Sequence, residues 1–123
     1  MIRRLALLPA VLLLVAACSS GASGPAETVP ADAFVVTAIP GLRFGEDTYT
    51  VDAGEITFAF VNEDSMRHTM LLAKDDVKVP NFRLVVNRKG DVDSSAVTLE
   101  PGTYLIFCDV PGHGNMKATL IVE

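Results

Sequence analysis

Short runs in which polar and apolar residues alternate constrain the fold of this chain more than any other feature. Residues 55–61 place Ile56, Phe58 and Phe60 on one face, which is the two-residue period of a β-strand. Similar runs, rich in β-branched and aromatic residues, end at glycine, proline, asparagine or aspartate. We predict strands over residues 33–39, 48–51, 55–61, 68–73, 82–86, 96–99, 103–107 and 118–122.

These patterns predict an all-β fold. No segment carries a sustained apolar stripe at helical spacing, and the turn signals recur regularly. Seven or eight short strands of this kind favour an antiparallel sandwich or barrel. An immunoglobulin-type sandwich is the competing assignment, but that fold's buried tryptophan is missing because the chain contains no Trp.

The first residues are predicted to be a targeting signal that does not belong to the fold. An arginine pair precedes an apolar run, residues 5–17, which is too short to span a bilayer. The run ends in the string VAAC, which resembles a bacterial lipobox whose cysteine is Cys18. The resemblance implies cleavage before Cys18 and lipid attachment to its sulfur. Cleavage at an ordinary signal peptidase site nearby is the alternative.

The chain therefore divides into three parts. Residues 1–17 are the predicted signal peptide with its lipobox, and residues 18–32 are the lipidated cysteine and a flexible linker. Small residues and proline dominate the linker, a composition that cannot build a core. Residues 33–123 are long enough for one small domain, which we expect to be a monomer.

The charge of the chain argues against nucleic-acid binding. The sequence has 10 basic and 15 acidic residues, and removal of the signal leaves 8 basic residues and a net charge of about −7. A protein this acidic is a poor ligand for phosphates. Adjacent acidic pairs at 46–47, 63–64 and 75–76 are interpreted mostly as solvated turns and strand ends. A docking face for a basic partner is the alternative.

Cys108 opens the string CDVPGHGNM, which also contains His113 and Met116. If Cys18 is lipidated, Cys108 has no disulfide partner, and an unpaired thiol outside the cytoplasm needs an explanation. A thiolate, an imidazole and a thioether suit copper better than zinc, calcium or magnesium. His68 is the only other histidine. Two histidines, one cysteine and one methionine are the donor set of a mononuclear blue copper site.

Each of these residues alone has a simpler interpretation. A single histidine is more often a surface or core residue, a methionine more often fills a core, and a lone cysteine is often buried and inert. Their joint occurrence favours a metal site. Cys108 ends one predicted strand and Met116 begins the next, so the loop between them folds back and directs its side chains to one point. His68 must then come from a neighbouring strand.

These segments resemble the cupredoxins, the plastocyanin-like blue copper proteins. Residues 101–120 look like the C-terminal signature of that family, and residues 56–68 look like its upstream ligand strand. The resemblance covers residues 35–122 and implies a Greek-key β-sandwich that binds one copper ion. The ligands that it implies are His68, Cys108, His113 and Met116.

Two positions depart from the family pattern. The residue after the upstream histidine is commonly asparagine, which braces the cysteine loop, whereas this chain has Thr69, whose hydroxyl can still donate. The spacing from His113 to Met116 is shorter than in many members. Met66 and Met70 are therefore alternative axial candidates, though poorer ones than Met116.

The resemblance implies a carrier of single electrons between extracytoplasmic redox proteins, held at a bacterial membrane through Cys18. Partners would dock transiently around His113. The principal alternative is a copper carrier or storage lipoprotein that delivers copper to an oxidase, and a third is a metal-free interaction domain. Enzymatic copper chemistry is not expected, because two histidines cannot form a trinuclear centre and one cysteine cannot form a binuclear centre resembling CuA.

Overall fold

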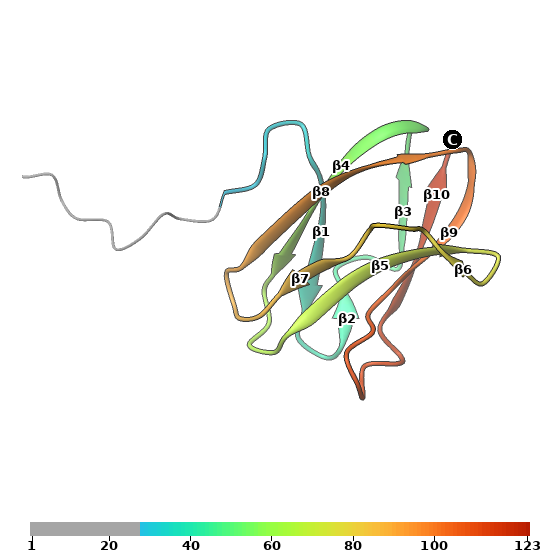
Figure 1. Ribbon diagram of the computed structural model, residues 1–123. Coiled ribbons are helices and arrows are strands. Elements are labelled where there is room, and N and C mark those ends of the chain that lie inside the picture. Colours follow the sequence, from blue (N-terminus) through green and yellow to red (C-terminus); the bar gives the residue numbers. More distant parts are fainter. Residues whose placement is uncertain (1–27) are drawn as a thin grey trace, which may run out of the picture.

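Two β-sheets packed on one another form the domain (Figure 1). The computed structural model describes residues 28–123, so the predicted signal peptide, Cys18 and most of the linker lie outside the described residues. The first sheet has the strand order β2-β1-β4-β8. Its strands are β1 (Phe34–Ile39), β2 (Arg43–Phe44), β4 (Gly54–Asn62) and β8 (Val92–Leu99).

The second sheet has the order β3-β10-β9-β5-β6, and β7 also pairs with β5. The chain passes back and forth between the two sheets, as a Greek-key sandwich requires, so the predicted all-β sandwich is confirmed. No helix among residues 28–123 is long and apolar enough to cross a membrane. The strands of this sheet are β3 (Thr48–Val51), β5 (His68–Lys74), β6 (Val77–Lys78), β7 (Leu84–Val86), β9 (Gly102–Phe107) and β10 (Lys117–Val122).

The strands differ from the sequence prediction in their number, their bounds and the direction of some pairings. The described residues form ten strands rather than seven or eight, because β2 and β6 are pairs of residues too short to show a period. β6 follows a tight turn in which Asp75 and Asp76 both have positive φ, the geometry of a type I′ hairpin turn. β8 begins at Val92 rather than at residue 96. β1 pairs with β4 and β3 with β10 in parallel, which alternation alone cannot reveal.

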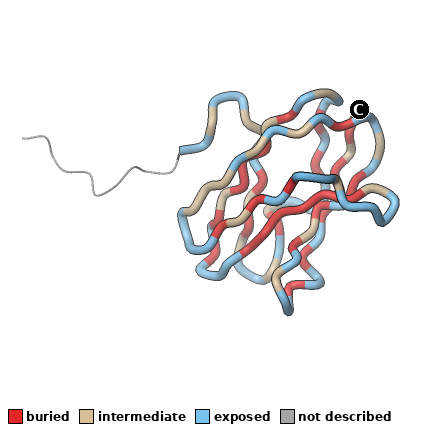
Figure 2. Tube along the Cα trace, in the orientation of Figure 1, coloured by how far each residue is buried: buried red, intermediate tan, exposed pale blue. Residues whose placement is uncertain are grey.

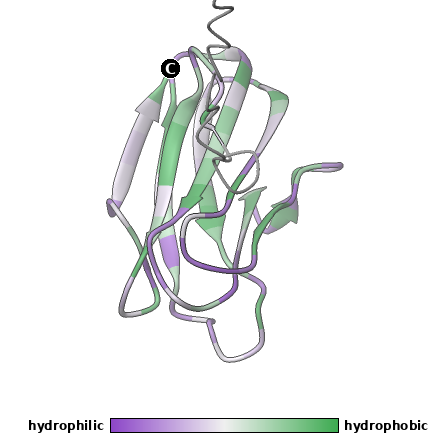
Figure 3. Cartoon of the chain, turned by 90° about the vertical axis from the view of Figure 1, so that its left-hand side faces the viewer, coloured by the Kyte–Doolittle hydropathy of each residue, from purple (hydrophilic) through white to green (hydrophobic). Residues whose placement is uncertain are grey.

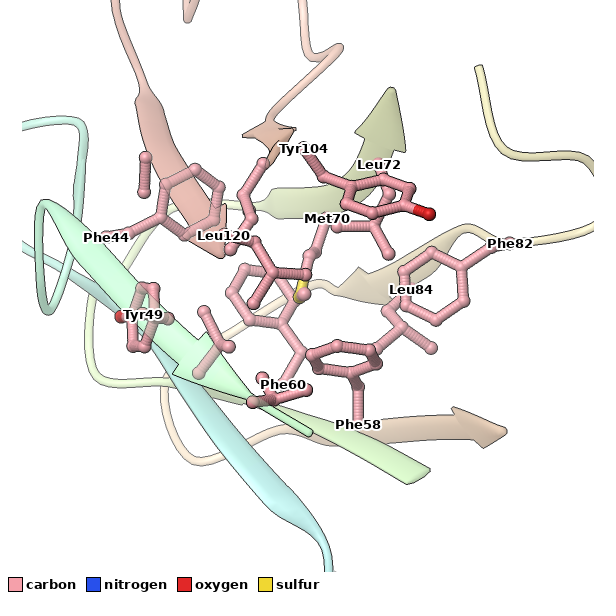
Figure 4. Close-up of a cluster of buried hydrophobic side chains, with 14 of the residues drawn as sticks. Phe44, Tyr49, Phe58, Phe60, Met70, Leu72, Phe82, Leu84, Tyr104 and Leu120 are labelled. Atoms are coloured by element: carbon pink, nitrogen blue, oxygen red, sulfur yellow. The ribbon is translucent and has the colours of Figure 1, made fainter. Parts of the chain in front are cut away.

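The core lies between the sheets and follows from the alternation seen in the sequence. Ile56, Phe58 and Phe60 of β4 are buried as predicted, and Phe58 meets Phe82 edge-on with ring centroids 5.6 Å apart (Figure 4). Apolar residues gather along the strands in Figure 3. Each fully buried side chain of this size contributes about 1.5–3 kcal/mol of hydrophobic stabilisation.

Strand β5 positions the site. All of its residues except Lys74 are buried, which appears as a nearly continuous red tube in Figure 2. β5 runs antiparallel to β9 with Leu71 opposite Phe107, so the start of β5 lies beside the end of β9. His68 begins β5 and Cys108 directly follows β9. The register of two central strands therefore brings these residues to the same end of the sandwich.

Candidate metal centre

His68, Cys108 and His113 meet at this end of the sandwich. The nitrogen or sulfur atoms that they offer all lie within 4.8 Å of one another, and all three residues are buried. Cys108 Sγ lies 3.7 Å from His113 Nδ1, and the two imidazole rings have centroids 5.0 Å apart. Cys108 is a free cysteine, so its sulfur is available as a ligand. His68 thus forms a single cluster with two residues that lie 40 and 45 positions later in the sequence.

His68 presents one nitrogen to this cluster and the other to the protein. Its Nε2 lies 2.8 Å from Asp64 Oδ2, and its Nδ1 is buried without a hydrogen-bond partner. Buried polar atoms are nearly always paired, so an orphaned nitrogen beside a thiol and a second imidazole indicates a ligand atom. The hydrogen bond with His68 holds the pKa of Asp64 below its usual value.

The loop from Cys108 to Met116 is held by short-range backbone hydrogen bonds. His113 N donates to Val110 O at 3.0 Å, and Met116 N donates to His113 O at 2.9 Å. Cys108 N donates to Met116 O at 3.3 Å and closes the loop at its base. Gly112 has a φ of +87°, a conformation that glycine adopts at low cost, and it lets the chain turn just before His113.

The structure separates the three candidate axial methionines. Met116 is 1% exposed and belongs to the same buried cluster as Cys108. Met66 is 46% exposed, in the turn before β5. Met70 is fully buried among the core side chains between the sheets (Figure 4). Burial favours Met116 over Met66, and its place in the loop that carries Cys108 and His113 favours it over Met70, which lies in the same buried cluster.

Thr69 connects β5, which begins with His68, to the loop that begins with Cys108. Its backbone N–H donates to Cys108 Sγ at 3.4 Å, and its hydroxyl oxygen lies 3.4 Å from the same sulfur. The hydroxyl accepts a hydrogen bond from Asp109 N and donates to Asp109 Oδ1 at 2.7 Å. The expectation that a threonine at this position can still bond to the cysteine loop is therefore confirmed.

Asp109 links the hydrogen bonds of Thr69 to a side chain at the surface. The Arg83 guanidinium donates two hydrogen bonds of 3.2 Å to its carboxylate and holds the pKa of Asp109 below its usual value. The side chains of Arg83 and Asp109 are 44% and 31% exposed, so solvent screens the pair, and we expect it to contribute less than about 1 kcal/mol.

Sequence reasoning missed Asp64 and its support. The sequence predicts a solvated acidic pair at 63–64, yet Asp64 is only 8% exposed while Glu63 is exposed. Asn62 is 1% exposed; its Oδ1 accepts from Asp64 N at 3.0 Å and its Nδ2 donates to Met66 O at 2.7 Å. No local signal in the sequence distinguishes such a buried turn aspartate from an exposed one.

The donor atoms fit copper. Two imidazole nitrogens and a thiolate form a nitrogen and sulfur set, and the unpaired Nδ1 of His68 faces it without competition from a protein donor. Calcium and magnesium prefer oxygen ligands, and none of the three clustered ligand atoms is an oxygen. Copper bound by two histidines and a cysteine is the blue copper arrangement.

An all-β sandwich with a cluster of two histidines and a cysteine at one end defines a cupredoxin. The model of the copper binding proteins of the plastocyanin/azurin family matches residues 32–123, and the chain belongs to this family. Copper is accordingly its cofactor. The family is one of copper-binding proteins, as the sequence predicts. A comparison with curated proteins finds no match.

Solved structures share this fold. Auracyanin B is 27% identical with a TM-score of 0.64, and the match covers 79% of this chain and 92% of that one. Auracyanin A, a "blue" copper protein from Chloroflexus aurantiacus, is 20% identical with a TM-score of 0.63, covering 74% and 98% of the two chains. An azurin from Methylomonas sp. strain J is 19% identical with a TM-score of 0.59, covering 76% and 99%.

Proposed function

We propose that this chain is a membrane-anchored type 1 copper protein that carries single electrons between extracytoplasmic redox partners. The observation that carries the proposal is the buried convergence of His68, Cys108 and His113 within 4.8 Å. These three residues would hold the copper, with Met116 as a fourth ligand. Copper bound in this way would supply reversible one-electron chemistry.

The protein's part is to keep the ligands in place while the charge of the metal changes. His68 lies at the start of β5, where it pairs with Val86 of β7, and the thiol of Cys108 accepts from the backbone of Thr69. Because these contacts are made within the fold, the ligand positions do not depend on the metal to define them. Little rearrangement favours rapid electron exchange over release of the ion, which supports electron transfer over copper delivery.

His113 would be the residue through which electrons pass between the copper and a redox partner. It is 5% exposed, and its neighbours Pro111, Gly112 and Gly114 are exposed and small enough for a second protein to approach closely. Transient redox encounters use small interfaces. A lipid on Cys18 and the linker after it would hold a monomeric domain near membrane-bound partners and raise their effective concentration.

The test of the copper site is visible spectroscopy of the purified protein loaded with one equivalent of Cu(II). We expect an intense blue thiolate-to-copper band that disappears in Cys108→Ser and that is bleached and restored by a reductant and an oxidant. Stoichiometric copper binding without a blue band in the wild type would contradict the proposal. Ready transfer of Cu(I) to a copper-free oxidase domain, with no reversible redox cycle, would favour the delivery function instead.

The anchor is tested separately. Mass spectrometry of the mature protein should find the chain beginning at Cys18 with an added lipid, and Cys18→Ala should move the protein out of the membrane fraction. An unmodified Cys18, or a Cys18→Ala protein that stays at the membrane, would exclude the lipid anchor without affecting the copper site.

A further inference from the structure

Asp64 presents a carboxylate to the back of the copper site. Its side chain is 10% exposed, and its Oδ2 lies 2.8 Å from His68 Nε2, the nitrogen that faces away from the ligand cluster. The other oxygen, Oδ1, accepts a hydrogen bond of 2.8 Å from Ser65 N. Both oxygens of this buried group therefore have a partner, and one of those partners is a residue that we propose as a copper ligand.

The turn before β5 fixes this carboxylate independently of any metal. Asn62 accepts from Asp64 N and donates to Met66 O, so its side chain closes the turn on both sides of Asp64. The backbone of Asn62 is itself held by Asp91 O and Gly90 N at 2.9 and 2.8 Å. The carboxylate is thus placed by the Asn62 side chain, whose backbone is in turn held by residues 90–91.

The contact selects one tautomer of His68. An acceptor at Nε2 requires the proton on that nitrogen, which leaves the lone pair of Nδ1 directed at the site, where Nδ1 is otherwise unpaired. A carboxylate that accepts from a ligating histidine also raises the basicity of the ring. The ligand tautomer is therefore present before copper binds.

The two histidines differ in this respect. Among the contacts of residues 28–123, no hydrogen bond joins a ring nitrogen of His113 to a carboxylate; its only such contact is with Cys108. Of the two histidines, only His68 thus has a carboxylate hydrogen-bonded to its ring. A buried anion near a metal favours the more highly charged oxidation state, since the interaction is weakly screened.

We propose that Asp64 is a positioning residue that sets the reduction potential, by holding His68 in the ligating tautomer and by stabilising Cu(II) relative to Cu(I). The inference rests on the proposed electron-transfer function. The redox step remains a one-electron change: a donor protein is oxidised, Cu(II) is reduced to Cu(I), and no bond within the protein is broken. Asp64 acts through His68 and does not touch the metal.

The test is Asp64→Asn, which keeps the shape and an acceptor oxygen but removes the charge. We expect the ratio of Cu(II) to Cu(I) affinity to fall by at least about tenfold, which is a rise in potential of about 59 mV for one electron. The matched control is Glu63→Gln, which removes an equal charge from the exposed neighbour. A redox titration of the blue band should show little change for it.

A second measurement does not depend on the variant folding. In the wild-type protein loaded with Cu(I), nitrogen NMR should find the proton of His68 on Nε2, hydrogen-bonded to a carboxylate. A proton on Nδ1, or equal potentials for Asp64→Asn and Glu63→Gln, would overturn the inference about Asp64. Absence of a blue band in the wild type would instead overturn the proposed function, so the two failures are distinguishable.

Discussion

The two sides of the copper site are built in different ways. On the strand side, residues 62–68 are tied to distant parts of the chain, since Glu63 N donates to Ala38 O and Asn62 bonds to the segment before β8. On the loop side, residues 108–116 are held by backbone hydrogen bonds among themselves. One side owes its shape to the whole sandwich and the other to a string of nine residues. Thr69 joins them through hydrogen bonds to Cys108 and Asp109.

Because they are built differently, the two sides suit different roles in the site. The strand side contributes a fully buried histidine with a fixed carboxylate behind it, which suits a ligand that must not move. The loop side contributes the thiol and His113, which is 5% exposed but has the exposed neighbours Pro111, Gly112 and Gly114, and this suits contact with a partner. Substitutions on the strand side should therefore affect folding and copper together, and substitutions on the loop side should affect the fold less.

The largest effect is expected for Asn62→Ala on the strand side. Loss of the amide leaves Asp64 N and Met66 O without their partners, and a buried unsatisfied group costs about 1–3 kcal/mol. We expect the copper-free protein to lose about 2–4 kcal/mol of unfolding free energy in urea, and copper to bind more weakly. Asn87→Ala, at an exposed asparagine, is the control and should change little. Equal stabilities for the two variants would mean that the turn is not held by Asn62.

An intermediate effect is expected for Thr69→Val, which breaks the bridge between the two sides. Valine keeps the shape of the side chain but leaves Asp109 N unpaired and removes a polar contact to the sulfur. We expect a loss of about 1–2 kcal/mol of unfolding free energy and a shifted blue band in the copper-loaded protein. Thr69→Ser keeps the hydroxyl and should recover most of both. A Thr69→Val protein that matches Thr69→Ser in both measurements would argue against the bridge.

The difference between the two sides also explains which site residues can be predicted from the sequence. The loop side is local, so Cys108, His113 and Met116 stand out as a motif within nine residues. His68 can be assigned because it is the only histidine in the chain besides His113. Asp64 cannot, because the adjacent acids at 63–64 look alike in sequence, and only the turn closed by Asn62 buries one and exposes the other.

The same distinction between local and non-local features decides which parts of the fold can be predicted. Alternation over residues 55–61 is a local property and correctly predicts β4 and its buried face. The pairing of β1 with β4 and of β3 with β10 is parallel and joins strands that are not consecutive, so it depends on how the chain crosses between sheets. Non-local pairings of this kind leave no trace in the periodicity of a single strand.

The smallest effect is expected within the loop side, at two glycines that flank His113. Gly112 has a φ of +87°, whereas Gly114 has no positive φ, and a Cβ added at either would meet no atom within 4 Å. An alanine side chain would therefore be uncrowded at both positions, and the two variants differ only in the backbone strain at residue 112. We expect Gly112→Ala to lower the unfolding free energy by about 1 kcal/mol and Gly114→Ala to change it by less than about 0.5 kcal/mol. Urea unfolding of both copper-free proteins tests this; equal losses would show that the loop can relax around an alanine at residue 112. The blue band should survive in both, since neither variant replaces a proposed ligand.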